Sequence, residues 1–277
     1  AENIFQDGGN PCMNAASKKA ILIVSFGTSY ENTRKRTIDA IERDIADAFP
    51  ACPAYRAWTS KMIIAKLKKR DGIIIHTVKE AMEQMLLDGI TDVIVQPTHV
   101  INGIENDQMK ADALSFRDRF SSIVFGNPLL TTEEDNQAVV QAVAGEFQDM
   151  DQETALVLMG HGTEHYANSV YAALDYRFKD MGHKNIFLGT VEAYPALDSL
   201  LRAADSFQPK KIVLAPFMIV AGDHAQNDLA GADPDSWMNR LSSEGYEVTP
   251  VLKGLGEYPQ VRQILVEHVQ QAMNVSV

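Results

Sequence analysis

The chain repeats part of its own pattern, and this repeat constrains its fold more than any other feature. The segment ILIVSFGTS (Ile21–Ser29) matches ALVLMGHGTE (Ala155–Glu164), since both have an apolar run, a small residue, a variable position and then Gly-Thr. Further along, DVIVQPTHVINGIE (Asp92–Glu105) matches KIVLAPFMIVAGDH (Lys211–His224), and both read as a strand, a proline and a mostly apolar stretch. The repeat predicts two related halves.

Corresponding positions in the two halves carry different chemistry. In the second match three pairs of residues recur at one offset: Pro97 with Pro216, Gly103 with Gly222 and Glu105 with His224. In the first match Phe26 corresponds to His161. Because only the second half has histidine at both positions, we expect an asymmetric site.

Apolar, β-rich segments alternate with segments of helical period along the chain. The predicted strands are Ala20–Phe26, Ala54–Trp58, Asp92–Gln96, Ile123–Gly126, Ala155–Met159, Ile186–Gly189, Lys211–Ala215 and Glu247–Val251. The predicted helices include Glu31–Ala48, Val78–Asp88, Glu133–Phe147, Asn168–Met181 and Gln260–Met273. This alternation predicts an α/β protein of two Rossmann-like halves, each a parallel sheet flanked by helices.

The predicted domains are a polar leader (residues 1–18), an N-terminal half (19–140) and a C-terminal half (141–277). The last helix is expected to pack on the N-terminal half. Ligands of parallel sheets bind beyond the carboxyl ends of the strands. Since all four matched segments begin at such ends, we expect a cleft between the halves to hold the site.

Charge and hydropathy exclude two kinds of partner. With 25 basic and 37 acidic residues the net charge is −12, which repels nucleic-acid backbones. No apolar run approaches the roughly 18–20 residues of a membrane span. The leader is polar and favours an exported, periplasmic protein, with a cytoplasmic one as the alternative. Export would permit a disulfide between Cys12 and Cys52.

Three residues at predicted strand or helix ends suit a metal ion. His161 lies between two glycines, which expose its imidazole, and His224 lies at a predicted helix start, where the dipole keeps it neutral. Glu192 could complete a set of mixed nitrogen and oxygen ligands for cobalt, nickel, iron or zinc. The alternatives are structural: a histidine bonded to a nearby carbonyl, a solvated first-turn histidine and a helix N-terminal charge.

The sequence resembles the anaerobic-type sirohydrochlorin cobaltochelatases, which are related to the class II chelatases. The resemblance is carried by VSFGTSYENT, TSKMIIAKLKKRDGI, HVINGIE, MGHGTEH, VEAYPALD, VAGDHAQNDLAG and GLGEYP, which together span almost the whole chain from Lys19 onward. It implies a chelatase-like fold and a lyase that inserts Co²⁺ into sirohydrochlorin during cobalamin biosynthesis. Fe²⁺ is the alternative metal.

By this resemblance, His161 and His224 correspond to the paired active-site histidines, Glu192 to a metal-binding carboxylate and Glu105 to a glutamate in the cleft. We therefore expect His161, Glu192 and His224 as metal ligands, and His161, Glu105 and His224 as catalytic groups. The loop Ser25, Phe26, Gly27 and Thr28 would present backbone and hydroxyl donors to substrate carboxylates. Arg34, Arg56 and Lys61 are candidates for a local basic patch.

Two features depart from the family pattern. The leader raises the prospect of export, and His76 follows three isoleucines where relatives tend to have an acidic residue. His76 is either a helix-capping or surface histidine, or an axial ligand of haem at the two-fold interface of a homo-oligomer. Three other histidines, His165, His183 and His268, are expected at the surface. A non-catalytic periplasmic protein that carries a metal or tetrapyrrole is the competing function, although Glu105 favours turnover because storage needs no proton acceptor.

Overall fold

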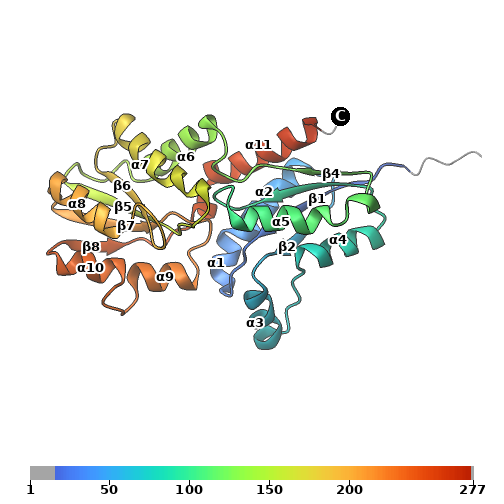
Figure 1. Ribbon diagram of the computed structural model, residues 1–277, viewed down its shortest axis with the longest axis horizontal. Helices are drawn as coiled ribbons and strands as arrows, with labels where there is room; N and C mark the ends of the chain where they lie inside the picture. Colours follow the sequence, from blue (N-terminus) through green and yellow to red (C-terminus); the bar gives the residue numbers. More distant parts are fainter. Residues whose placement is uncertain (1–15, 276–277) are drawn as a thin grey trace, which may run out of the picture.

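The chain forms two four-stranded parallel sheets, side by side in Figure 1. The computed structural model describes residues 16–275, apart from the side chains of Asp223 and His224. The first sheet has the order β2-β1-β3-β4 and the second β6-β5-β7-β8. The strands are β1 Lys19–Ser25, β2 Ala54–Trp58, β3 Asp92–Pro97, β4 Ser122–Phe125, β5 Thr154–Gly160, β6 Ile186–Thr190, β7 Lys211–Pro216 and β8 Glu247–Pro250. The predicted α/β class is confirmed.

The strand register reproduces the sequence repeat. Pro97 at the end of β3 pairs with Val24, two residues before Phe26, and Pro216 at the end of β7 pairs with Met159, two residues before His161. Each of these strands leads to a helix whose N-cap is a glycine in extended conformation, Gly103 before α5 and Gly222 before α9. The repeated segments are therefore repeated structures.

Eleven α-helices surround the sheets in the described residues. In the first half they are α1 Glu31–Arg36, α2 Ile38–Ala48, α3 Lys61–Asp71, α4 Val78–Leu87 and α5 Ile104–Leu114. The remaining helices are α6 Glu133–Glu146, α7 Ser169–Asp180, α8 Leu197–Phe207, α9 Asp223–Ala230, α10 Trp237–Ser243 and α11 Pro259–Val275. None of the helices within residues 16–275 is long and apolar enough to cross a membrane.

The single helix predicted over Glu31–Ala48 is wrong, because Thr37 divides it into α1 and α2. The Thr37 hydroxyl donates to the carbonyl of Thr33 at 2.6 Å, and its backbone leaves the helical region (φ −118°, ψ −83°). A side chain that bonds to the carbonyl four residues earlier bends a helix. Thr37 is fully buried, so this bend is part of the packed interior.

Both faces of each sheet are covered. Ile21 and Ile23 of β1 belong to the core cluster that includes α2 and α11, whereas Leu22 and Val24 pack with α4 and α5. Alternate residues of a strand point to opposite faces, so a strand buried on both faces is apolar throughout. The continuous apolar runs of the sequence have this cause.

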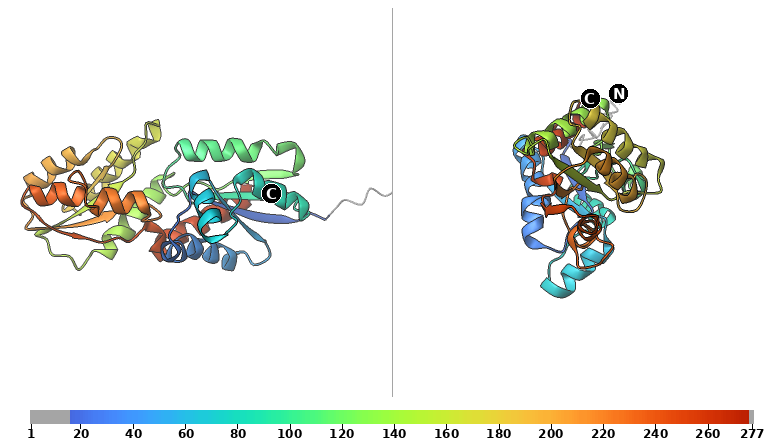
Figure 2. Two further views of the ribbon diagram at one scale, coloured as in Figure 1. Left: turned by 90° about the horizontal axis from the view of Figure 1, so that it is seen from below. Right: turned by 90° about the vertical axis from the view of Figure 1, so that its left-hand side faces the viewer.

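The last helix, α11, leaves the second half and returns to the first, where it lies beside α2, β3 and β4 (Figures 1 and 2). His268 of α11 is 1% exposed and bonds through Nδ1 to the carbonyl of Asn127 and through Nε2 to Asp135, both at 2.8 Å. His268 was expected at the surface, and that expectation is wrong because α11 buries it against α6.

The connection between the halves runs through α6, which is continuous across the predicted boundary between residues 140 and 141. The chain enters the second sheet at Thr154. Cys52 is half-buried against the main core cluster. Cys12 and most of the predicted leader lie outside the described residues, so the Cys12–Cys52 disulfide stays a prediction.

Candidate active site

The carboxyl ends of the two sheets meet at the junction between the halves. From the second half, His165, in the loop after β5, bonds to Asp107 of α5. Val220, in the loop after β7, packs against the cluster that contains Ile38 and Trp58 of the first half. The loops that carry the predicted site residues therefore lie at this junction, as the sequence repeat led us to expect.

His161 directly follows β5, and its side chain is 55% exposed. Its Nδ1 lies 2.9 Å from the carbonyl oxygen of Gly162. Because a carbonyl can only accept, Nδ1 carries the proton, and Nε2 of the neutral ring has a free lone pair. The hydrogen bond to a nearby carbonyl, the structural alternative for this histidine, is therefore compatible with a role in metal binding. It orients the ring and leaves Nε2 available to a metal or a proton.

Glu192 is brought beside His161 by backbone pairing beyond the sheet. The N–H of Val191 donates to the carbonyl of Gly160 and the N–H of Glu192 to that of His161, at 2.9 and 3.0 Å. The Glu192 carboxylate Oε1 then lies 3.9 Å from His161 Nε2. Divalent first-row cations bond imidazole nitrogen and carboxylate oxygen at about 2.0–2.2 Å, so one ion can reach both atoms.

A third ligand was predicted at His224. Its backbone lies in the first turn of α9, at the position that corresponds to Glu105 in α5, but its side chain is outside the described part of the structure. Among the side chains that are described, no three of the metal-binding types come together. The pair of His161 and Glu192 is the part of the predicted ligand set whose geometry is defined.

Glu105 lies in the first turn of α5, on the first half, with an exposed side chain. The Thr59 hydroxyl donates to its Oε2 at 2.9 Å, and the Thr59 N–H donates to the carbonyl of Ser25. The strand ends of β1 and β2 thus hold the carboxylate in place at the junction while it stays open to water.

The loop Ser25–Thr28, expected to present donors to substrate carboxylates, has both of its hydroxyl groups in the interior. The Ser25 and Thr98 hydroxyls bond to each other at 2.8 Å in the interior, and Thr28 is 3% exposed. The Thr28 hydroxyl accepts from the N–H of Tyr30 at 3.3 Å, so neither hydroxyl is exposed to water. Gly27 is also buried, with a φ of +111°, and it lies against the ring of Trp58. Phe26, 45% exposed, is the one member of the loop whose side chain faces outward.

The predicted basic patch is largely neutralised. Arg56 of β2 forms ion pairs with both Asp39 and Glu42 of α2, so its guanidinium joins the strand to the helix. Arg34 pairs with Asp39 and is 15% exposed, and it lines a cavity of about 270 Å³ in the first half. Lys61 is exposed at the start of α3.

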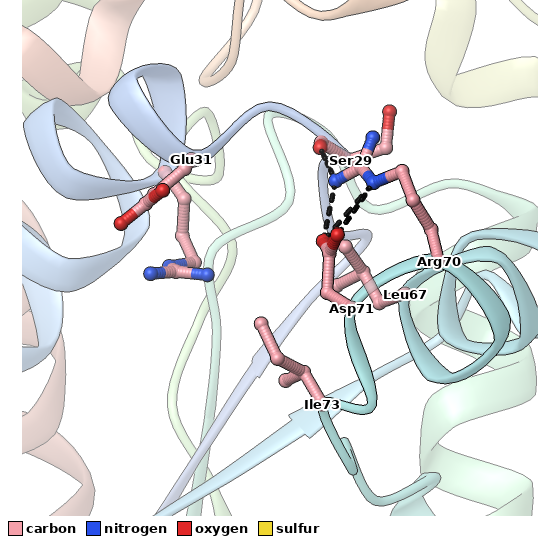
Figure 3. A pocket seen from close by; sticks show the side chains of 7 residues that line it. Ser29, Glu31, Leu67, Arg70, Asp71 and Ile73 are labelled. Atoms are coloured by element: carbon pink, nitrogen blue, oxygen red, sulfur yellow. Dashed lines mark hydrogen bonds and ion pairs between the residues drawn. The ribbon is translucent and has the colours of Figure 1, made fainter.

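Arg70, which no sequence pattern singled out, lines the same cavity (Figure 3). Its guanidinium donates to the carbonyl of Ser29 at 2.6 Å and to the carboxylate of Asp71 at 2.7 Å. This guanidinium also holds the pKa of Asp71 below its ordinary value. The arginine thus anchors the loop after β1 to α3, and its charge is balanced within the cavity.

His76 lies between α3 and α4, and its carbonyl accepts from the N–H of Trp58 at 2.9 Å. Ile75 is buried, Ile74 is 64% exposed, and the His76 side chain is half-buried. The three-isoleucine run therefore alternates between the core and the surface.

The histidine expected at the surface at position 165 is instead 12% exposed at the junction. Its Nε2 lies 3.0 Å from Asp107 Oδ2. Neither residue stood out in the sequence, because a contact between the halves leaves no local pattern.

Two parallel sheets flanked by helices are a fold that this protein shares with solved chelatases. The structure is similar to that of the sirohydrochlorin chelatase SirB from Bacillus subtilis subspecies spizizenii in complex with cobalt, with a TM-score of 0.66 and 16% identity. This similarity covers 94% of this chain and 97% of that one, and it shows a common fold.

The sequence matches the family described as Cobalt chelatase (CbiK) over residues 19–274, and the chain belongs to this family. It is 40% identical to the sirohydrochlorin cobaltochelatase of Salmonella typhimurium, over 94% of this chain and 98% of the relative. It is 31% identical to the sirohydrochlorin cobaltochelatase CbiKC of Nitratidesulfovibrio vulgaris, over 93% of this chain and 92% of the relative. The family expected from the sequence motifs is confirmed.

Proposed function

We propose that this protein is an enzyme that inserts Co²⁺ into sirohydrochlorin during cobalamin biosynthesis. The observation that carries the proposal is the free Nε2 of His161, 3.9 Å from the Glu192 carboxylate at the junction between the two sheets. The names of the relatives from Salmonella typhimurium and Nitratidesulfovibrio vulgaris support the same substrate and metal.

Insertion exchanges two pyrrole protons for one divalent cation. The ion must lose water, lie above the macrocycle and replace both N–H protons, which leave as two H⁺. His161 Nε2 and Glu192 hold the ion through two bonds, and His224 of α9 supplies the third ligand in this proposal. A site with so few protein ligands can release its ion to the four macrocycle nitrogens.

In this proposal, groups on both sides of the junction accept the pyrrole protons. Once the metal has left, the neutral His161 imidazole can accept a proton, and Glu105 accepts from the opposite half. Positioned general bases of this kind contribute about 10²–10⁴-fold to a rate. The Glu105 carboxylate is exposed, so a proton taken there can pass to water. Phe26, which occupies the place of His161 in the first half, offers an apolar contact to the flat macrocycle.

The test is the absorbance change on metallation of sirohydrochlorin, with Co²⁺ and with Fe²⁺, which also ranks the two metals. We expect His161→Ala and His224→Ala to lower kcat by at least tenfold, and His183→Ala, a turn residue after α7, to leave it unchanged. If the wild type does not exceed the uncatalysed rate but still binds the metal or tetrapyrrole, the protein is a carrier and the enzymatic proposal fails.

Three further proposals concern the setting of the enzyme. A periplasmic location is proposed, with the cytoplasm as the alternative, and subcellular fractionation separates the two. A homo-oligomer is proposed, and the mass of the protein in solution tests this proposal.

At a subunit interface His76 would bind haem beside the exposed Ile74. A haem spectrum whose Soret band is unchanged in His76→Ala would contradict this last proposal.

A further inference from the structure

The contact between His165 and Asp107 joins the two halves close to the proposed site. His165 Nε2 lies 3.0 Å from Asp107 Oδ2, and its Nδ1 accepts from the N–H of Ala167 at 3.0 Å. Since Nδ1 is an acceptor, the proton is on Nε2 and is donated to the carboxylate. Both nitrogens of a ring only 12% exposed are thus satisfied in one orientation.

His165 is tied to the loop that carries His161. Its N–H donates to the Thr163 hydroxyl at 3.2 Å, and the N–H of Thr163 donates to the side-chain oxygen of Asn168 at 3.0 Å. The Asn168 amide in turn donates to the carbonyl of Tyr194 at 2.8 Å, in the loop that carries Glu192. The imidazole of His165 is therefore one end of a network that joins both loops of the proposed metal site.

Asp107 belongs to the first half, where it lies close in sequence to Glu105. It lies in the first turn of α5, two residues after Glu105, in a helix that begins at the buried Gly103. A shift of α5 relative to the loop after β5 would change the separation between the metal site and the Glu105 carboxylate. The contact between His165 and Asp107 bridges the helix and the loop directly.

We infer that His165 and Asp107 are a pair of positioning residues that sets the distance between the metal-holding side and the proton-accepting side of the site. This inference rests on the proposed function. A single hydrogen bond to a carboxylate that is 64% exposed adds little to stability, but misplacement of catalytic groups by about 1 Å can cost as much as 100-fold in rate. The pair should therefore affect turnover far more than stability.

The variants for the test are Asp107→Ala, His165→Ala, the double variant and Asp107→Asn, whose amide oxygen can still accept from Nε2. Glu83→Ala is the matched control. The Glu83 carboxylate is exposed to a degree similar to that of Asp107, but it pairs with Arg119 within the first half. Co²⁺ insertion gives kcat and KM, Co²⁺ affinity is measured without tetrapyrrole, and thermal unfolding reports on the fold.

We expect kcat to fall about tenfold in each alanine variant and no further in the double variant. Asp107→Asn and Glu83→Ala should keep the wild-type kcat, and Co²⁺ affinity should be unchanged throughout, because His161 and Glu192 lie on the same half. Because Asp107 is 64% exposed, its replacement should not prevent folding.

Wild-type kcat in both single variants, beside an inactive His161→Ala, would overturn this inference alone. Multiplied losses in the double variant, or a loss of Co²⁺ affinity as large as the loss of kcat, would also overturn it. A wild type without insertion activity would overturn the proposed function, and the positioning role with it.

Discussion

Gly162 shows how one residue shapes the proposed site. Its φ is +84°, and a Cβ at this position would lie 2.8 Å from the Cβ of Thr190 and 3.0 Å from the nitrogen of Ala193. The residue therefore combines a left-handed backbone with close contact to the segment that leads to Glu192. Its carbonyl also receives the Nδ1 proton of His161. Replacement should disturb the ring that holds the metal.

We expect Gly162→Ala to lower the free energy of unfolding by about 3 kcal/mol, from backbone strain and crowding together, and to lower the insertion rate at least tenfold. Gly182→Ala is the control, because Gly182 has a φ of +94° but open space around it. That variant should lose about 1 kcal/mol and no activity. Chemical denaturation and the insertion assay measure both, and equal effects in the two variants would contradict the argument.

His99 gives the protein a pH dependence that is unrelated to catalysis. Burial lowers the pKa of His99 to about 4, although the nearby Asn106 amide opposes the shift, and neither ring nitrogen has a hydrogen-bond partner of ordinary geometry. An unfolded histidine has a pKa near 6.5, so between pH 6.5 and about 4 only the unfolded state gains the proton. Stability is therefore complete above pH 6.5 and falls as the pH is lowered.

The expected loss from His99 is about 3 kcal/mol between pH 6.5 and 4. His99→Leu should flatten this part of the stability profile measured by denaturation at each pH. His183→Leu, in the turn after α7, controls for the removal of a histidine and should keep the wild-type slope. A slope that persists unchanged in His99→Leu would show that other groups cause it.

Among the elements, the eight strands could be predicted to within one or two residues. The central strands β1, β3, β5 and β7 were the clearest, because a strand buried on both faces has a continuous apolar sequence. The helices were less predictable. The break at Thr37 depends on a side-chain hydrogen bond and on burial beneath the loop that contains Gly256. Helical periodicity continues through such a bend, so the pattern of apolar residues does not mark it.

Helix α11 is the element whose docking is most sensitive to one side chain. His268 bonds to the Asn127 carbonyl and to Asp135, and Asp135 is itself 8% exposed. Removal of the imidazole leaves Oδ1 of this buried carboxylate without a partner, although Oδ2 still accepts from the N–H of Thr132, and the loss costs about 3 kcal/mol.

We therefore expect His268→Leu to lower the free energy of unfolding by about 3 kcal/mol, measured by chemical denaturation. Gln271→Leu, at an exposed position of the same helix, should change it by less than about 0.5 kcal/mol. Equal, small effects would mean that the apolar face of α11 alone holds the helix on the first half.

At the scale of the whole molecule, the net charge of −12 acts on both proposed substrates. The arginines nearest the loop after β1 are paired with carboxylates, so they do little to offset this field. The field attracts Co²⁺ and repels the carboxylates of sirohydrochlorin.

Raising the ionic strength from about 0.01 to 0.15 M shortens the Debye length from roughly 30 to 8 Å. We expect kcat/KM for Co²⁺ to fall and kcat/KM for sirohydrochlorin to rise over this range, in steady-state assays with the other substrate saturating. An inert neutral solute at matched osmolality is the control. A fall for sirohydrochlorin would instead indicate a local basic field at the site.

The sequence by itself determined the two repeated halves, the family, and the placement of Phe26, Glu105, His161 and Glu192 at strand or helix ends that meet at one junction. Strand and helix periods are local properties of the backbone, and the repeat relates one half to the other. Only the tertiary structure decided which side-chain atoms near the site are open to a ligand and which are taken up by hydrogen bonds within the protein. The Ser25 hydroxyl turns inward to a residue 73 positions away, and His165 finds its carboxylate 58 positions away. Such partners are brought together by packing between distant segments, which no local pattern records.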